Sequence, residues 1–215
     1  MPIASLNRFT VPLSATQAAS TQGLLMPKMK YRFRVTLDNF GVAGTPSTEL
    51  TKQVMSVSRP DITFDEVTLD VYNSRVKLLG KHKIGDPKLK IRDDASGVVA
   101  KKVGEQLQKQ FDFFEQSSAA SGIDYKFRMR VEMLDGGNGA FEPVTLESFE
   151  FLGCYIKQVA YQGGDYTSND PMDIDMTLSV DNVIQLESPG GNASGIGLNV
   201  GRVVRPAGAQ GLSTG

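Results

Sequence analysis

The chain has 215 residues, of which 40% are hydrophobic and 22% are charged, a composition typical of one or two soluble domains with a sizeable core. Its formal net charge of -1 excludes a polycation that binds nucleic acid through overall charge. No apolar run approaches the length of about 20 residues that a membrane-spanning helix needs, and residues 1–29 lack the apolar stretch of a secretory signal. We therefore expect a soluble chain that is synthesised in the cytoplasm.

The two ends of the chain differ in composition from its middle. Residues 1–27 are rich in Ser, Thr, Ala and Gln, and residues 188–215 contain eight glycines, so neither end is expected to form a core alone. We therefore divide the chain into an N-terminal extension (1–27), a β domain (28–187) and a Gly-rich C-terminal extension (188–215).

The middle of the chain begins with alternating patterns that predict strands. Apolar and polar residues alternate over residues 30–37, which is typical of a half-buried strand. Over residues 62–71 the apolar phase changes at Val67, which indicates a bulge, a bend or two separate strands. Residues 75–79 and 88–92 flank Gly80 and a Gly-Asp-Pro turn, so we expect a hairpin-like excursion between them.

The period then changes to that of a helix. Apolar residues recur at intervals of three and four, which predicts one amphipathic helix near residues 95–117. The apolar set is Val99, Val103, Leu107, Phe111 and Phe114. The residues Asp93, Asp94 and Ser96 are candidates for capping its N-terminus.

Alternating patterns return after the helix. They cover residues 124–134, 144–152 and 172–180, and the first two are separated by the turn-like sequence Asp-Gly-Gly-Asn-Gly. The sequence therefore predicts a mostly β (α+β) fold, an antiparallel β-sandwich or barrel with one amphipathic helix.

The C-terminal extension contains a short alternating pattern of its own. Ile196, Leu198 and Val200 are separated by single small or polar residues. This period of two is typical of a strand that joins another sheet, and the three residues are our candidates for contacts made by this tail. The alternative is a flexible tail, which the composition fits equally well.

Residues for catalysis or metal binding are scarce. Cys154 is the only cysteine, which excludes an intrachain disulfide or a cysteine-based metal cluster, and it is expected to be buried. His82, the only histidine, lies in a basic run and is expected to be exposed, without an accompanying nucleophile motif. We therefore expect no catalytic residue, no metal site and no cofactor, and hence no enzyme.

Charge is divided unevenly along the chain. Residues 1–60 carry seven basic and two acidic side chains, whereas residues 135–189 carry one basic and ten acidic ones. Such opposed blocks favour contacts between copies, or they neutralise each other within one monomer. Asp173 and Asp175 share one face of a strand and need water or a cation nearby. The basic stripe of Lys126, Arg128 and Arg130 is suited to an acidic partner surface or to nucleic acid.

The order of segments between residues 54 and 94 is distinctive. Ser-Arg-Pro (58–60) precedes Asp-Glu-Val-Thr-Leu (65–69), Tyr-Asn-Ser-Arg (72–75), Gly80 and Lys-Leu-Lys-Ile-Arg-Asp-Asp (88–94). After the helix come Glu-Met-Leu-Asp-Gly (132–136) and Leu-Gly-Cys-Tyr (152–155). Over about residues 30–182 this sequence resembles the tail tube proteins of contractile-tailed bacteriophages, which are related to tube proteins of phage-tail-like bacteriocins and type VI secretion.

The resemblance implies an assembly. Members of that family form hexameric rings in which each subunit adds strands to one continuous β-barrel, and the rings stack into a hollow conduit for genome ejection inside a contractile sheath. The implied partners are further copies of the chain, the tail sheath protein, baseplate and tail-terminator proteins, and genomic DNA that passes without sequence-specific binding. The implied location is the tail of the virion.

Charge and alternation suggest residues for two roles in such an assembly. An acidic bore would repel DNA phosphates, and Asp173, Asp175 and Glu147 are our candidates for its lining. Lys126, Arg128 and Arg130 are candidates for contacts between subunits.

Two alternatives stay open from the sequence. One is a tube-terminating or baseplate-proximal ring protein of the same fold. The other, from a different class, is a monomeric β-barrel that binds a small ligand.

Overall fold

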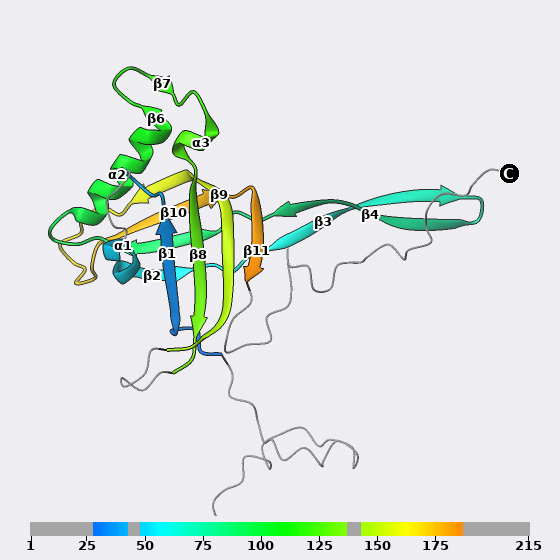
Figure 1. Cartoon of the computed structure of the whole chain (residues 1–215), viewed down its shortest axis with the longest axis horizontal. Helices are drawn as coiled ribbons and strands as arrows, with labels where there is room; N and C mark the ends of the chain where they lie inside the picture. Colours follow the sequence, from blue (N-terminus) through cyan, green and yellow to red (C-terminus); the bar gives the residue numbers. More distant parts are fainter. Residues whose placement is uncertain (1–27, 43–47, 137–142, 187–215) are drawn as a thin grey trace, which may run out of the picture.

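A computed structural model describes residues 28–42, 48–136 and 143–186 of the chain (Figure 1). Most of the described residues form antiparallel strands, with one long helix. The strands of the body are β1 (Phe33–Asp38), β2 (Val54–Val57), β5 (Lys88–Arg92), β8 (Phe127–Leu134), β9 (Thr145–Tyr161), β10 (Asp173–Ser179) and β11 (Asn182–Leu186). The remaining elements are α1 (Thr48–Gln53), β3 (Ile62–Val71), β4 (Ser74–Ile84), α2 (Val98–Gln110), β6 (Phe111–Asp112), β7 (Ser117–Ser118) and α3 (Gly122–Tyr125).

The body strands form two layers that share the long strand β9. Their order is β1-β8-β9-β10-β5-β2, and β11 pairs with the first part of β9. The four-stranded layer therefore contains β1, β8, the first part of β9 and β11, and the second layer contains the rest of β9 with β10, β5 and β2. In Figure 1 the second layer crosses behind the first. Within the described ranges β1 and β2 do not pair, so the sheet stays open and does not close into a barrel.

A glycine marks the point where β9 passes from one layer to the other. Gly153 has φ of 66°, in the left-handed region that favours glycine. A Cβ atom at this position would clash with Oδ2 of Asp181. The position therefore requires glycine for both its backbone conformation and its close contact with the start of β11.

The core lies between the layers. Val131, Phe151 and Ile174 are at most 1% exposed and come from β8, β9 and β10, where apolar residues alternate with polar ones as predicted. Cys154 is also fully buried, which raises the pKa of its thiol to about 12 because burial disfavours the thiolate.

The helix α2 is shorter than the predicted range of 95–117. It begins at Val98, where Asp94 accepts the backbone N–H of Val99 at 3.0 Å, and it ends at Gln110. The apolar periodicity continues to Phe111 and Phe114, but both lie beyond the helix. The carboxylate of Asp112 accepts the backbone N–H groups of Phe114 and Glu115, which favours a turn over a further helical turn. Phe114 is consequently 91% exposed.

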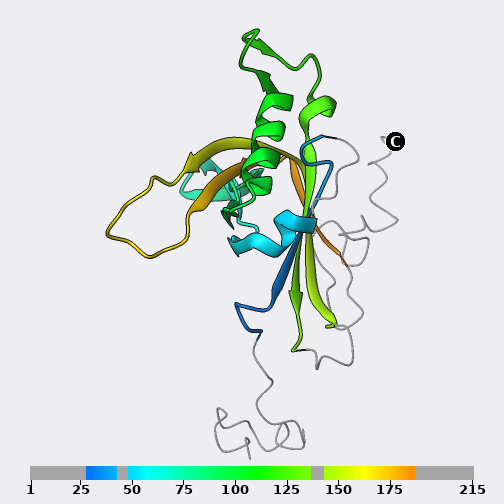
Figure 2. The same cartoon turned by 90° about the vertical axis from the view of Figure 1, so that its left-hand side faces the viewer.

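The strands β3 and β4 form a long hairpin that projects away from the body (Figure 1). In Figure 2 the view runs along this hairpin, which lies behind the body. We call residues 62–84 the arm. The predicted hairpin-like excursion between residues 75–79 and 88–92 is wrong, because β4 pairs with β3 while β5 pairs with β10 and β2.

The phase change in β3 is a bulge, since the register with β4 shifts between Phe64 and Glu66. Gly80 lies opposite this bulge inside β4, and a Cβ atom there would lie 2.7 Å from the carbonyl oxygen of Asp65.

Candidate assembly surfaces

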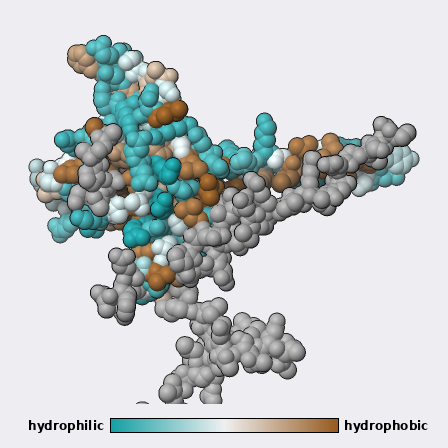
Figure 3. Space-filling view, viewed as in Figure 1, coloured by the Kyte–Doolittle hydropathy of each residue, from teal (hydrophilic) through white to brown (hydrophobic). Residues whose placement is uncertain are grey.

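The two faces of the arm differ in polarity. Paired residues of an antiparallel hairpin lie on the same face, so the pairs Val67 with Leu78 and Leu69 with Val76 form an apolar strip. The opposite face carries ion pairs, in which Arg75 lies 2.8 Å from Asp70 and Lys77 lies 3.0 Å from Glu66. Figure 3 shows apolar residues along the arm.

Within the described residues, the apolar strip of the arm has no cover. Val67, Leu69, Val76 and Leu78 are each 46–48% exposed, and no other element of the described chain covers them. An isolated two-stranded hairpin is only marginally stable in water, and burying one large apolar side chain fully contributes about 1.5–3 kcal/mol. An exposed apolar strip of this kind is typical of a surface that packs against another one.

The four-stranded layer ends in two strands, β1 and β11, each of which pairs with one neighbour on its inner side. In the part of the chain that the structure describes, no strand pairs with the outer edge of β1 or of β11. Each strand runs antiparallel to the next, so the outer strands β1 and β11 run in opposite directions. Such edges carry unpaired N–H and C=O groups that accept further strands.

The predicted basic stripe lies on the face of this layer that is turned away from the core, and its first residue precedes β8. Arg128 and Arg130 of β8 both reach Oε1 of Glu150 on β9, at 3.2 and 3.6 Å. Lys126, just before β8, binds Asp181, and the hydrogen bond from this carboxylate raises the pKa of the lysine. All three cations therefore have intramolecular partners, and their role in subunit contacts stays a prediction.

Asp173 and Asp175 lie on β10 beside Lys90, a cation of the kind that two carboxylates on one face of a strand were expected to need. Asp173 pairs with Lys90 of β5 at 3.0 Å, and Asp175 is the strand partner of Lys90. The hydrogen bond with Asp173, together with the charges of both carboxylates, raises the pKa of Lys90. The side chain of Asp173 is only 8% exposed.

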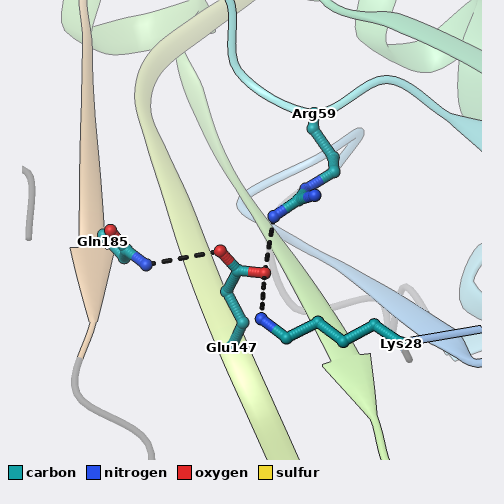
Figure 4. A network of polar contacts seen from close by, with 4 residues as sticks. All are labelled: Lys28, Arg59, Glu147 and Gln185. Atoms are coloured by element: carbon teal, nitrogen blue, oxygen red, sulfur yellow. Dashed lines mark hydrogen bonds and ion pairs between the residues drawn. The ribbon is translucent and has the colours of Figure 1, made fainter. Parts of the chain in front are cut away.

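Glu147, the third acidic candidate, is the centre of a polar network (Figure 4). Its Oε2 atom accepts hydrogen bonds from Nζ of Lys28 at 2.7 Å and from a guanidinium nitrogen of Arg59 at 2.6 Å. Its Oε1 atom accepts one from Gln185 at 3.3 Å. Burial alone raises the pKa of Glu147, but the lysine hydrogen bond and the two positive charges outweigh it and hold the pKa below its ordinary value.

The Glu147 network joins distant parts of the chain. Lys28 leads into β1, Arg59 lies at the base of the arm, and Gln185 lies in β11, the last described strand. These three partners of Glu147 could not be predicted, because no local pattern in the sequence links them. Whether Glu147, Asp173 and Asp175 line a bore stays a prediction.

The described residues offer little for catalysis. They contain no cluster of three or more His, Cys, Asp or Glu side chains that could hold a metal ion. His82 is exposed on β4, and Cys154 is buried. None of the described helices is long and apolar enough to cross a membrane.

Solved structures with a similar arrangement of strands are found among the parts of contractile injection systems. The tube-terminating cap of the anti-feeding prophage aligns with a TM-score of 0.56 at 18% identity, over 81% of this chain and 99% of that chain. A chain of the PVC sheath-tube complex, an extracellular contractile injection system in the extended state, aligns with a TM-score of 0.53 at 19% identity, over 81% and 99%. The protein has the fold of contractile-tail tube proteins.

A third structure with the tube fold extends the comparison. The PVC sheath/tube terminator aligns with a TM-score of 0.54 at 19% identity, over 77% of this chain and 100% of that chain. No family model matches the chain, and no curated protein matches it in sequence. These alignments confirm the resemblance to tail tube proteins that the order of segments over about residues 30–182 indicated, although the sequence identities are only 18–19%.

Proposed function

We propose that the protein is a structural subunit of a tail tube, in which six copies form a ring and rings stack into a hollow conduit inside a contractile sheath. The tube fold supports this proposal. The observation that carries it is the arm, because its apolar strip of Val67, Leu69, Val76 and Leu78 is uncovered in the described chain and gains a partner in an assembly.

The open edges of the four-stranded layer offer a way to close a ring. Because β1 and β11 run in opposite directions, β11 of one copy can pair antiparallel with β1 of the next. Every copy uses the same two edges, so the contact is head-to-tail and closes when the rotation between copies completes a circle. Ring closure also removes the unpaired edges that otherwise promote aggregation.

The bore of such a ring is lined by charged groups in this proposal. If the four-stranded layers join edge to edge, the face opposite the core, with the Arg128 and Arg130 pairs to Glu150, lies along the conduit. This packing does not place Asp173 and Asp175 along the conduit, because β10 belongs to the second layer, and it turns Glu147 to the core side with Phe149 and Phe151. The prediction that these three acidic residues line the bore therefore requires a different packing of the subunits. Asp175→Lys tests it, because this change slows ejection of DNA from assembled particles without abolishing tubes only if Asp175 faces the bore.

The remaining partners follow from this role. We infer that the tube contacts a sheath protein on its outside and baseplate and terminator proteins at its ends, within the tail of a virion or a related particle. DNA passes the bore without sequence-specific binding. The subunit itself has no catalytic activity in this proposal.

Negative-stain electron microscopy and analytical ultracentrifugation of the full-length protein test the proposal. Hexamer-sized rings or hollow tubes that grow with concentration are expected. A monomer of 23.3 kDa that does not change with concentration would overturn it and favour the ligand-binding module.

A tube terminator is the second candidate. It is favoured by the alignments with a tube-terminating cap and a sheath/tube terminator, which are as close as that with the sheath-tube complex. Single rings that never stack, at any concentration, would support this candidate, whereas long tubes would contradict it.

A further inference from the structure

An apolar groove lies where β1 and β2 face each other at the open side of the body. It has a volume of about 730 Å³. Tyr31, Phe33 and Met133 line one side, β2 lines the other, and Arg59 lies at the groove as well as in the Glu147 network. The groove therefore lies between β1 and β2, the two ends of the described strand order.

The groove meets β2 along its edge. All four consecutive residues of Val54–Val57 line it, whereas a groove over one face of a strand would be lined by alternate residues. Among the described strands, β2 pairs with β5 alone, so its other edge is open to a further strand. Backbone hydrogen bonds to such an edge, combined with apolar contacts, bind extended segments in many proteins.

We infer that residues 195–201 of the same chain bind in this groove as an added strand on β2. This segment lies outside the described residues, and in its sequence Ile196, Leu198 and Val200 alternate with Gly195, Gly197, Asn199 and Gly201. An extended conformation places the three apolar side chains on one face, toward Phe33 and Met133, and the small residues on the other. The inference concerns a contact within one chain and goes beyond the proposed tube function.

The start of the C-terminal extension lies close enough to the groove. Gln185, one residue before the end of β11, donates to Glu147, which also binds Arg59 at the groove. Strand neighbours across the four-stranded layer place Leu186 about three strand spacings, or about 14 Å, from β1. Nine residues separate Leu186 from Ile196, and an extended chain of that length reaches about 30 Å.

Other occupants fit the groove less well. In the N-terminal extension, Phe9, Val11 and Leu13 alternate, but Pro12 between them has no backbone N–H to donate to β2, and the run at residues 24–26 is consecutive rather than alternating. A segment from a second copy competes with one that is tethered nearby at an effective concentration of about 1 mM or more. The segment of the same chain is therefore favoured.

A disulfide trap tests the position of the segment. In the double variant Met55→Cys and Leu198→Cys, mild oxidation is expected to produce a monomeric intrachain disulfide, because Met55 lines the groove. Cys154 does not interfere, since it is buried and its thiol has a pKa of about 12. The control pairs Met55→Cys with Ala209→Cys in the same extension and is expected to react at least fivefold more slowly. Equal rates for the two pairs, or disulfide-linked dimers as the main product, would overturn the inference.

Hydrogen exchange of the β2 amides provides a second test on the full-length chain. Leu198→Asp is expected to accelerate exchange at Met55 and its strand neighbours at least tenfold, whereas the control Asn199→Asp on the opposite face leaves it unchanged. Unchanged exchange in Leu198→Asp, or acceleration by Leu25→Asp in its place, would contradict the inference. Both experiments use dilute monomer, so they give an answer whether or not the protein forms tubes.

Discussion

The body and the arm are built from similar amphipathic strands but differ in what covers their apolar faces. In the body, Val131 and Phe151 are fully buried between two layers. In the arm, Leu69 and Leu78 have the same alternating surroundings yet stay 47% and 48% exposed. A period of two therefore predicts a strand with one apolar face, but it does not say whether the covering surface belongs to the same chain or to another one.

The comparison predicts a large loss of stability from truncating a phenylalanine in the body and almost none from truncating one in the arm. Phe151→Ala opens a cavity in the body and is expected to lower the free energy of unfolding by about 3–5 kcal/mol. Phe64→Ala in the arm, where the side chain is 56% exposed, is expected to change it by less than about 0.5 kcal/mol in the monomer. Urea unfolding of dilute protein measures both. Similar losses in the two variants would mean that the arm is packed in the monomer.

The layer junction of the body gives the next largest effect. Gly153→Ala forces alanine into a left-handed conformation and against Asp181, so we expect a loss of about 2–3 kcal/mol in unfolding free energy. Gly104→Ala is the matched control, because Gly104 lies inside α2 with no atom near its missing Cβ. The control is expected to stabilise the protein by about 0.5–1 kcal/mol. A neutral Gly153→Ala would refute the role of this glycine at the junction.

A substitution in the apolar strip of the arm is expected to weaken assembly rather than folding. Leu69→Asn removes an apolar side chain from the uncovered strip, and losing about 1.5–3 kcal/mol of contact raises the concentration needed for assembly at least about tenfold. Thr68→Asn, on the charged face of the same strand, is the control and should leave assembly unchanged. Sedimentation velocity over a concentration series distinguishes the two. If both variants assemble as the unaltered protein does, the apolar strip is not an interface.

The same contrast explains how far the sequence predicts the fold. Alternation in β8 and β10 predicted both the strands and their buried residues, because which face of a strand a side chain occupies depends only on its position along the strand. Gly80 misled the prediction, since glycine indicates a turn but here lies within β4 opposite a bulge. The helix was predicted too long because Phe111 and Phe114 keep its period, while the turn around Asp112 ends it.

The candidate surfaces were less predictable than the strands. The acidic residue Glu147 was recognised from charge alone, but its partners Lys28, Arg59 and Gln185 come from three segments that meet only in the folded chain. Likewise, the groove beside β2 depends on two strands at opposite ends of the sheet order. Properties that depend on long-range pairing leave no local pattern in the sequence.

Substitution in the Glu147 network is expected to have the smallest effect on stability, and its pH dependence is expected to differ from that of an ion pair in the arm. Because the folded state holds the pKa of Glu147 below its ordinary value, its stabilisation is complete at neutral pH and is lost as pH falls through that lowered pKa. Glu147→Gln removes the charge that binds Lys28 and Arg59, so we expect a loss of about 1–2 kcal/mol in unfolding free energy at about pH 7. The loss should shrink as the pH is lowered to about 3, since protonation removes the same charge from the unaltered protein.

An ion pair of the arm is the control for this pH dependence. Glu66 pairs with Lys77 on the exposed face of the arm, and Glu66→Gln is expected to cost less than about 0.5 kcal/mol at any pH, because water screens the pair. Urea unfolding at several pH values compares the two variants. Parallel curves for Glu147→Gln and the unaltered protein would show that this carboxylate does not hold the N-terminal entry, the arm base and β11 together.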